Sequence, residues 1–158
     1  MSKDYKQTIS FLQNILASSV DVELAQSSEF SCLLEIEMSR KDRNLVREGQ
    51  AFRGLGNVYD FQGRWEDSIA QYKQSLEIFC EVGDRHGEGA TLNNLGGVYQ
   101  LQGRWEEAIA QYEQSLEIFR SLDDRHGEGA TLNNLAVVYN SQGRWEEAIA
   151  QYEQSLEI

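Results

Sequence analysis

The chain has 158 residues, about the size of one domain, and 26 acidic against 14 basic residues give it a formal net charge of −12. The absence of proline disfavours a fold of short strands joined by turns, and two cysteines are too few for a disulfide framework. The acidic balance argues against nucleic acid, and no apolar run approaches the ~20 residues of a membrane span. We therefore expect a cytoplasmic protein that binds neither nucleic acid nor membrane.

The first 45 residues contain two helical patterns that differ from the rest of the chain. The first has an apolar stripe at helical spacing, formed by Tyr5, Ile9, Leu12 and Leu16. A second helix is expected from Val22 to about Arg40. We interpret residues 1–45 as a degenerate helical repeat that caps an array, because terminal repeats need a more polar outer face. An N-terminal regulatory helix pair is the alternative.

The remaining chain repeats itself every 40 residues, which is the strongest signal in the sequence. The tetrapeptide Gln-Gly-Arg-Trp occurs at residues 62–65, 102–105 and 142–145, and residues 84–118 and 124–158 differ at four places. We divide this part into three repeats, 46–85, 86–125 and 126–158.

Each repeat carries two helical stripes separated by the Gln-Gly-Arg-Trp motif. In the middle repeat, Gly103 follows the first helix in a position suited to its C-terminal cap, and Trp105 opens the second. Residues 83–87 are expected to link successive repeats, with Asp84 as the N-cap of the next helix. Gly96 lets a second helix approach closely. Because one helix pair cannot bury both stripes alone, we predict an all-α fold, an α-solenoid of stacked antiparallel pairs.

The repeat resembles the tetratricopeptide repeat (TPR), whose pattern is W-x₂-L-G-x₂-Y followed by A-x₃-F. The middle repeat has Leu92-x₂-Leu95-Gly96-x₂-Tyr99 and then Ala108-x₃-Tyr112. The first Trp is replaced, the Pro is absent and the period is 40 residues. This long form is similar to the repeats of kinesin light chain, Pins-type adaptors and bacterial, especially cyanobacterial, arrays. The resemblance implies a right-handed TPR superhelix.

The resemblance also implies a concave groove, lined by the first helix of each repeat, that takes up an extended peptide or a partner helix. Amide side chains recur on these helices, and paired amide donors and acceptors can hold a peptide backbone. In the first repeat the corresponding residues include Asp60 and Phe61. The groove residues predicted to bind are Arg53, Asn57, Asn93, Asn94, Gln100, Asn133, Asn134 and Asn140. Solvated surface amides are the alternative interpretation.

The last helix is expected to leave an apolar stripe uncovered, because the sequence ends within the second helix of the third repeat. This stripe consists of Trp145, Ile149, Tyr152 and Leu156. Either the array continues in a longer protein, or this end pairs with another molecule and drives end-to-end homo-oligomerisation.

No motif for catalysis, metal or cofactor binding emerges. His86 and His126 lie in equivalent predicted linkers without Cys or acidic partners at ligand spacing, so capping or loop roles are favoured. Cys32 and Cys80 are expected to be small core residues. The Trp residues of the three tetrapeptides are expected in the inter-helix core.

The sequence thus predicts a non-catalytic scaffold that binds a protein or peptide partner in a concave groove. The alternatives are a regulatory or sensor segment of a larger signalling protein, and an array that self-associates through its uncapped end.

Overall fold

The computed structural model describes residues 28–158, which contain helices and no strand. The prediction of an all-α fold is confirmed. The expected stripe at residues 5–16 lies outside the described residues, as does the beginning of the helix predicted from Val22. The helices are α3 (Ser28–Lys41), α4 (Leu45–Phe61), α5 (Trp65–Val82), α6 (Arg85–Leu101), α7 (Trp105–Ser121), α8 (Arg125–Ser141) and α9 (Trp145–Leu156).

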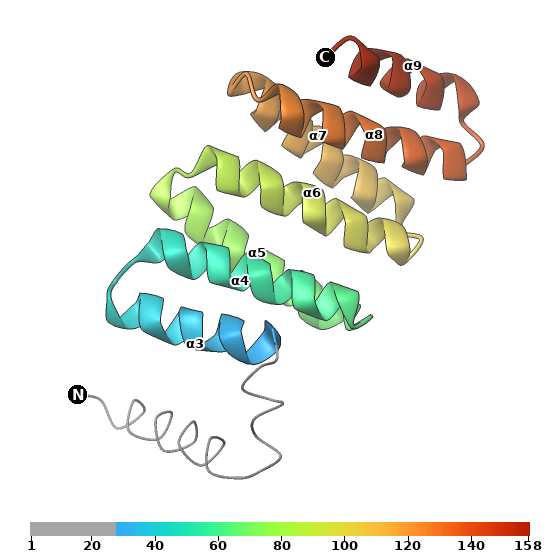
Figure 1. Ribbon diagram of the computed structural model, residues 1–158. Coiled ribbons are helices and arrows are strands. Elements are labelled where there is room, and N and C mark those ends of the chain that lie inside the picture. Colours follow the sequence, from blue (N-terminus) through green and yellow to red (C-terminus); the bar gives the residue numbers. More distant parts are fainter. Residues whose placement is uncertain (1–27) are drawn as a thin grey trace.

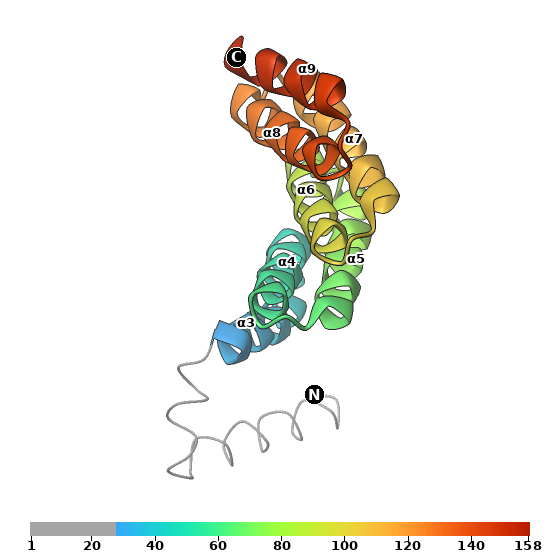
Figure 2. The ribbon, with the colours of Figure 1, turned by 90° about the vertical axis from the view of Figure 1, so that its right-hand side faces the viewer.

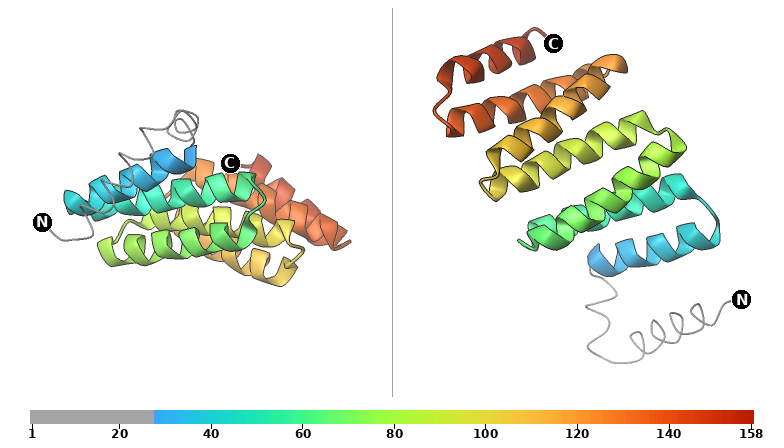
Figure 3. Two further views of the ribbon diagram at one scale, coloured as in Figure 1. Left: turned by 90° about the horizontal axis from the view of Figure 1, so that it is seen from below. Right: turned by 180° about the vertical axis from the view of Figure 1, so that it is seen from behind.

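Successive helices run antiparallel, and each packs on its neighbours in the chain (Figures 1 and 3). Figure 2 shows two layers, with α4, α6 and α8 on the inner side of a curve and α5 and α7 on the outer side. The inner helices also touch directly, α4 with α6 and α6 with α8. The first helices of the repeats therefore line a concave face, as the solenoid prediction requires.

The helix ends follow local sequence signals. The Asp84 side chain accepts a hydrogen bond from Gly87 N at 2.9 Å, which confirms the predicted N-cap of α6. Gly103 adopts φ 70° just after α6, a left-handed conformation that glycine reaches without steric cost. Where Gly83 precedes α6 with φ 72°, Asp123 takes the same role before α8 with φ 54°.

The predicted linker of residues 83–87 is wrong in its second half, because α6 already begins at Arg85. Gly87 lies in the first turn of α6, and a Cβ added there would come within 2.8 Å of the Phe79 ring. This glycine therefore serves close packing between α5 and α6 and does not break a helix. His86 lies in the same turn, so its placement in a linker is also wrong.

Aromatic rings fill the space between the two layers. Tyr72 and Tyr112 are each 1% exposed and pack on the glycines of the preceding helices. A Cβ added at Gly56 would approach the Tyr72 ring to 2.5 Å, and one at Gly96 would approach the Tyr112 ring to 2.7 Å. The predicted close approach at Gly96 is thus confirmed.

Two expectations about the core need correction. Cys80 is exposed, because it follows the fully buried Phe79 by one residue and so faces away from the core, whereas Cys32 is half-buried against α4. Trp105 is partly buried against the core, whereas Trp65 and Trp145 remain 38% and 60% exposed. The tryptophans therefore lie at the edge of the helix interface.

Candidate functional site

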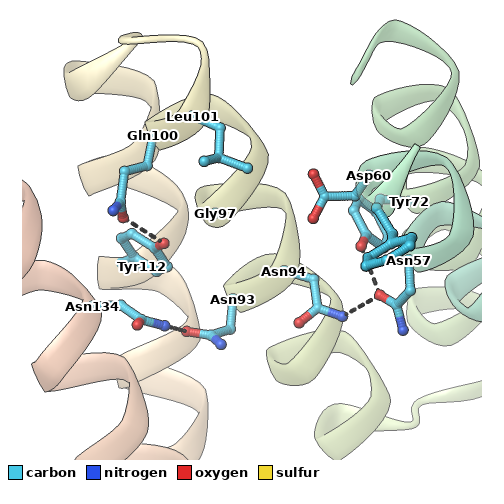
Figure 4. Close-up of a pocket in the computed structure, with 11 residues that line it drawn as sticks. Asn57, Asp60, Tyr72, Asn93, Asn94, Gly97, Gln100, Leu101, Tyr112 and Asn134 are labelled. Carbon is cyan, nitrogen blue, oxygen red and sulfur yellow. Dashed lines mark hydrogen bonds between the residues drawn. The ribbon is translucent and has the colours of Figure 1, made fainter. Parts of the chain in front are cut away.

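The concave face carries a groove with a volume of about 490 Å³, formed between α4, α6 and α8 and floored by two tyrosines (Figure 4). It gathers five of the eight predicted groove residues, from three successive repeats. Its lining comprises Asn57, Asp60, Phe61, Tyr72, Asn93, Asn94, Gly97, Gln100, Leu101, Tyr112 and Asn134.

Three predicted groove residues lie outside this lining. The Arg53 guanidinium lies 5.9 Å from the centre of the Phe79 ring. Asn133 lines a separate pocket of about 380 Å³ beside His126 at the start of α8. Asn140 is exposed near the end of α8. The groove therefore includes fewer residues than the sequence predicted, and it is centred on α6.

Asparagine side chains connect the inner helices across the groove. Asn94 Nδ2 donates to Asn57 Oδ1 at 2.9 Å, which joins α6 to α4. Asn134 Nδ2 donates to Asn93 Oδ1 at 3.1 Å, which joins α8 to α6. Each bond uses only part of the capacity of an amide, which offers two donors and two acceptor lone pairs. The amide ladder therefore holds the repeats in register and keeps donors and acceptors for a ligand.

The two tyrosines at the groove floor donate hydrogen bonds to amide side chains of the lining. Tyr72 Oη donates to Asn57 Oδ1 at 2.6 Å, and Tyr112 Oη donates to Gln100 Oε1 at 3.0 Å. Burial raises the pKa of Tyr72 to about 12 and raises the pKa of Tyr112 as well. Both phenols are therefore neutral at physiological pH.

Asp60 was placed at a groove position from the sequence but was not among the residues predicted to bind. Asp60 Oδ1 is buried and has no hydrogen-bond partner within the described part of the chain. Burial raises the pKa of this carboxyl group above its ordinary value. The available signal was its position, since Gln100 and Asn140 occupy the equivalent places in the next repeats and only the first repeat has an acid there.

Apolar side chains flank the carboxylate. Phe61 is 95% exposed and Leu101 is 59% exposed, and both line the groove. They follow from the repeat pattern, since residue 61 of the first repeat aligns with residue 101 of the second. The groove thus combines amides, one carboxylate and accessible apolar surface.

The predicted C-terminal stripe is largely exposed. Trp145, Ile149, Tyr152 and Leu156 are 60%, 56%, 40% and 86% exposed. The equivalent Tyr112 and Leu116 of α7 are buried, because α8 covers α7. The side chains of this stripe are therefore accessible along α9.

Neither histidine belongs to a metal-binding cluster within residues 28–158. His86 Nε2 lies 3.2 Å from Asp124 Oδ2, and the centres of the His86 and Phe119 rings are 5.8 Å apart in an edge-to-face arrangement. His86 therefore lies beside the end of α7 and the α7–α8 loop, with its side chain 68% exposed. Within residues 28–158, no three His, Cys, Asp or Glu side chains lie close enough together to hold a metal ion. In the same range, no helix is long and apolar enough to cross a membrane.

Comparison with known families matches this geometry. Models described as tetratricopeptide repeat match residues 51–78 and residues 87–158, which together are more than half of the chain. A search of curated proteins finds no significant match.

Solved structures show the same fold. The TPR domain of FLU from Arabidopsis is 22% identical with a TM-score of 0.66, over 70% of this chain and 93% of that one. BtubC (BKLC) from P. vanneervenii is 24% identical with a TM-score of 0.68, over 98% and 65%. Kinesin light chain-like TPR repeats from Podosopora anserina are 19% identical with a TM-score of 0.68, over 96% and 71%. At these identities the likeness shows the fold alone.

Proposed function

The chain belongs to the tetratricopeptide repeat family, and from this premise we propose that its concave groove binds an extended peptide segment of a protein partner. Proteins of this family generally mediate protein–protein interaction, and their fold is generally non-catalytic. The specific proposal concerns the groove between α4, α6 and α8.

The observation that carries the proposal is the amide ladder beside an accessible groove. Asn94 and Asn134 face solvent in part while their Nδ2 groups tie the repeats together. Their carbonyl oxygens remain available to accept hydrogen bonds from peptide N–H groups, and Asn57 Nδ2 remains available to donate to a peptide carbonyl. Because the helices are already ordered, binding costs little conformational entropy on this side.

The groove also has room that packing does not require. A Cβ added at Gly97 would meet Tyr112 Oη at 3.7 Å, an ordinary contact distance. Val137 occupies the equivalent position of the third repeat. The absence of a side chain at residue 97 therefore leaves space in the groove without being needed for the fold.

A peptide selection tests this proposal. A phage-displayed library of random peptides is selected against the full chain, and the affinity of a selected peptide is measured by fluorescence anisotropy. Gly97→Leu, which fills the groove, and the pair Asn94→Ala and Asn134→Ala are expected to weaken binding at least about tenfold. Gln114→Ala, an exposed site on α7, serves as the control. Unchanged affinity in both groove variants would contradict the proposal.

A second proposal concerns the exposed stripe on α9. We propose that it packs against a second copy of this chain, because α7 carries the same stripe and buries much of it under the following helix. Light scattering at rising protein concentration should show association that Ile149→Glu abolishes and Glu153→Gln preserves. A strict monomer at every concentration would refute this second proposal.

A further inference from the structure

The groove contains a carboxylate that nothing in the described chain neutralises. Asp60 Oδ1 is buried without a hydrogen-bond partner, and no ion pair within residues 28–158 includes Asp60. Figure 4 shows its carboxylate pointing from α4 toward α6, into the groove. A buried acceptor without a donor is unfavourable for the free protein. A ligand that donates a hydrogen bond to Asp60 would therefore remove this unfavourable contribution.

The neighbouring side chains do not act as that donor. Tyr72, which lies beside Asp60, donates its hydroxyl proton to Asn57 Oδ1. Asn57 Oδ1 also accepts from Asn94, so these two donors are directed to the same amide oxygen and not to Asp60. The Arg53 guanidinium lies 5.9 Å from the centre of the Phe79 ring and forms no ion pair with Asp60.

The other repeats treat this position differently. Gln100 replaces the acid in the second repeat and accepts the Tyr112 hydroxyl at 3.0 Å. Asn140 replaces it in the third repeat. The first repeat therefore places a single charge in a row whose other members are neutral amides. A positively charged side chain of a ligand is therefore expected to bind most favourably beside Asp60.

We propose that the groove binds its peptide through an arginine or lysine side chain whose cationic head pairs with the Asp60 carboxylate and whose aliphatic stem packs beside Leu101 and Phe61. This inference rests on the proposed peptide-binding function. Leu101 and Phe61 supply exposed apolar surface on the lining that holds the acid. An aromatic ring also favours a guanidinium over its face. The net charge of −12 attracts a basic partner at longer range.

The test uses two tripeptides that differ in charge alone. Acetyl-Leu-Arg-Leu-amide and its citrulline analogue, which is neutral and nearly isosteric, are titrated into the ¹⁵N-labelled full chain and followed by NMR. The arginine peptide is expected to shift the amide signals of Asn57, Asn94 and Leu101 and to bind at least about tenfold more tightly than the citrulline peptide.

Asp60→Asn separates the charge from the fold, because the third repeat already carries Asn at this place. The variant should bind both tripeptides with the affinity that the wild type shows for citrulline. Asn140→Asp, combined with Asp60→Asn, moves the acid by two repeats and should not restore the shifts at Asn57. An arginine preference that survives Asp60→Asn would overturn the inference.

The outcome is independent of the broader proposal. If both tripeptides bind equally and Gly97→Leu blocks both, the groove still binds peptides and the cation inference fails. If neither tripeptide binds saturably at millimolar concentration, the cation inference also fails, and the library selection decides the groove function separately.

Discussion

Two adjacent glycines on α6 should respond in opposite ways to the same substitution. Gly96→Ala and Gly97→Ala each remove a glycine from a helix interior, and that change alone stabilises a helix by about 1 kcal/mol. The two sites differ in what the new methyl group meets. At Gly97 it lies 3.7 Å from Tyr112 Oη, and at Gly96 it lies 2.7 Å from Tyr112 Cε1.

The net effects follow from these distances. Gly97→Ala should stabilise the protein by about 1 kcal/mol, because no neighbour has to move. At Gly96 the Tyr112 ring is 1% exposed and cannot swing away, so overpacking costs about 1–3 kcal/mol and offsets the helix gain. Gly96→Ala should therefore lie between neutral and about 2 kcal/mol destabilising. The third repeat tolerates Ala136 there because its partner Tyr152 is 40% exposed.

Urea unfolding followed by far-ultraviolet circular dichroism measures both variants against the wild type. Their midpoints should move apart, upward for Gly97→Ala and downward or not at all for Gly96→Ala. Because repeat arrays can unfold in parts, hydrogen exchange of α6 amides provides a local check. Equal stabilisation by both substitutions would refute the packing argument at Gly96.

Four further outcomes are expected. Asp60→Asn should stabilise the fold by about 0.5 kcal/mol at neutral pH, as measured by urea unfolding, and this value is modest because the side chain is half-buried. The stabilisation should shrink as pH falls through the raised pKa of Asp60, because the wild-type carboxyl group then becomes neutral. Tyr72, with its pKa raised from 10.0 to about 12, should stabilise the fold below pH 10 and lose that contribution as pH rises toward 12, which an absorbance titration against Tyr72→Phe checks. Asp84→Ala removes an N-cap and should cost about 1 kcal/mol in urea unfolding. Ser115→Ala removes a buried hydrogen bond of 2.9 Å to Gly89 O and should destabilise the fold by about 1 kcal/mol. Ser155→Ala should destabilise it less, because its 3.2 Å hydrogen bond is only partly buried. Equal losses of stability for the two variants in thermal melts would contradict this difference.

The fold could be predicted from the sequence because its determinants are local and repeated. Asp84 caps the helix that follows it, and Asn44 and Asp124 cap the equivalent helices one 40-residue period before and after it. Gly96 was identified as a packing position for the same reason. By contrast, Gly87 and His86 were assigned to a linker, because the contact of Phe79 with Gly87 depends on how α5 docks against α6.

The candidate site could be predicted in part. The amides at residues 57, 93, 94, 100 and 134 were recognised from their place on the first helices, and they line one groove. The unpartnered carboxylate of Asp60 could not be foreseen, because it depends on Tyr72 donating to Asn57 and leaving Asp60 aside. Such choices between acceptors are made by tertiary geometry.

An NMR map of a library-selected peptide on the full chain tests whether the concave groove is the peptide-binding site. Amide signals should shift along α4, α6 and α8, centred on Asn94 and Gly97, and α9 signals should stay in place. Shifts centred on the α9 stripe or on the outer helices α5 and α7, with the groove signals unmoved, would contradict this proposal.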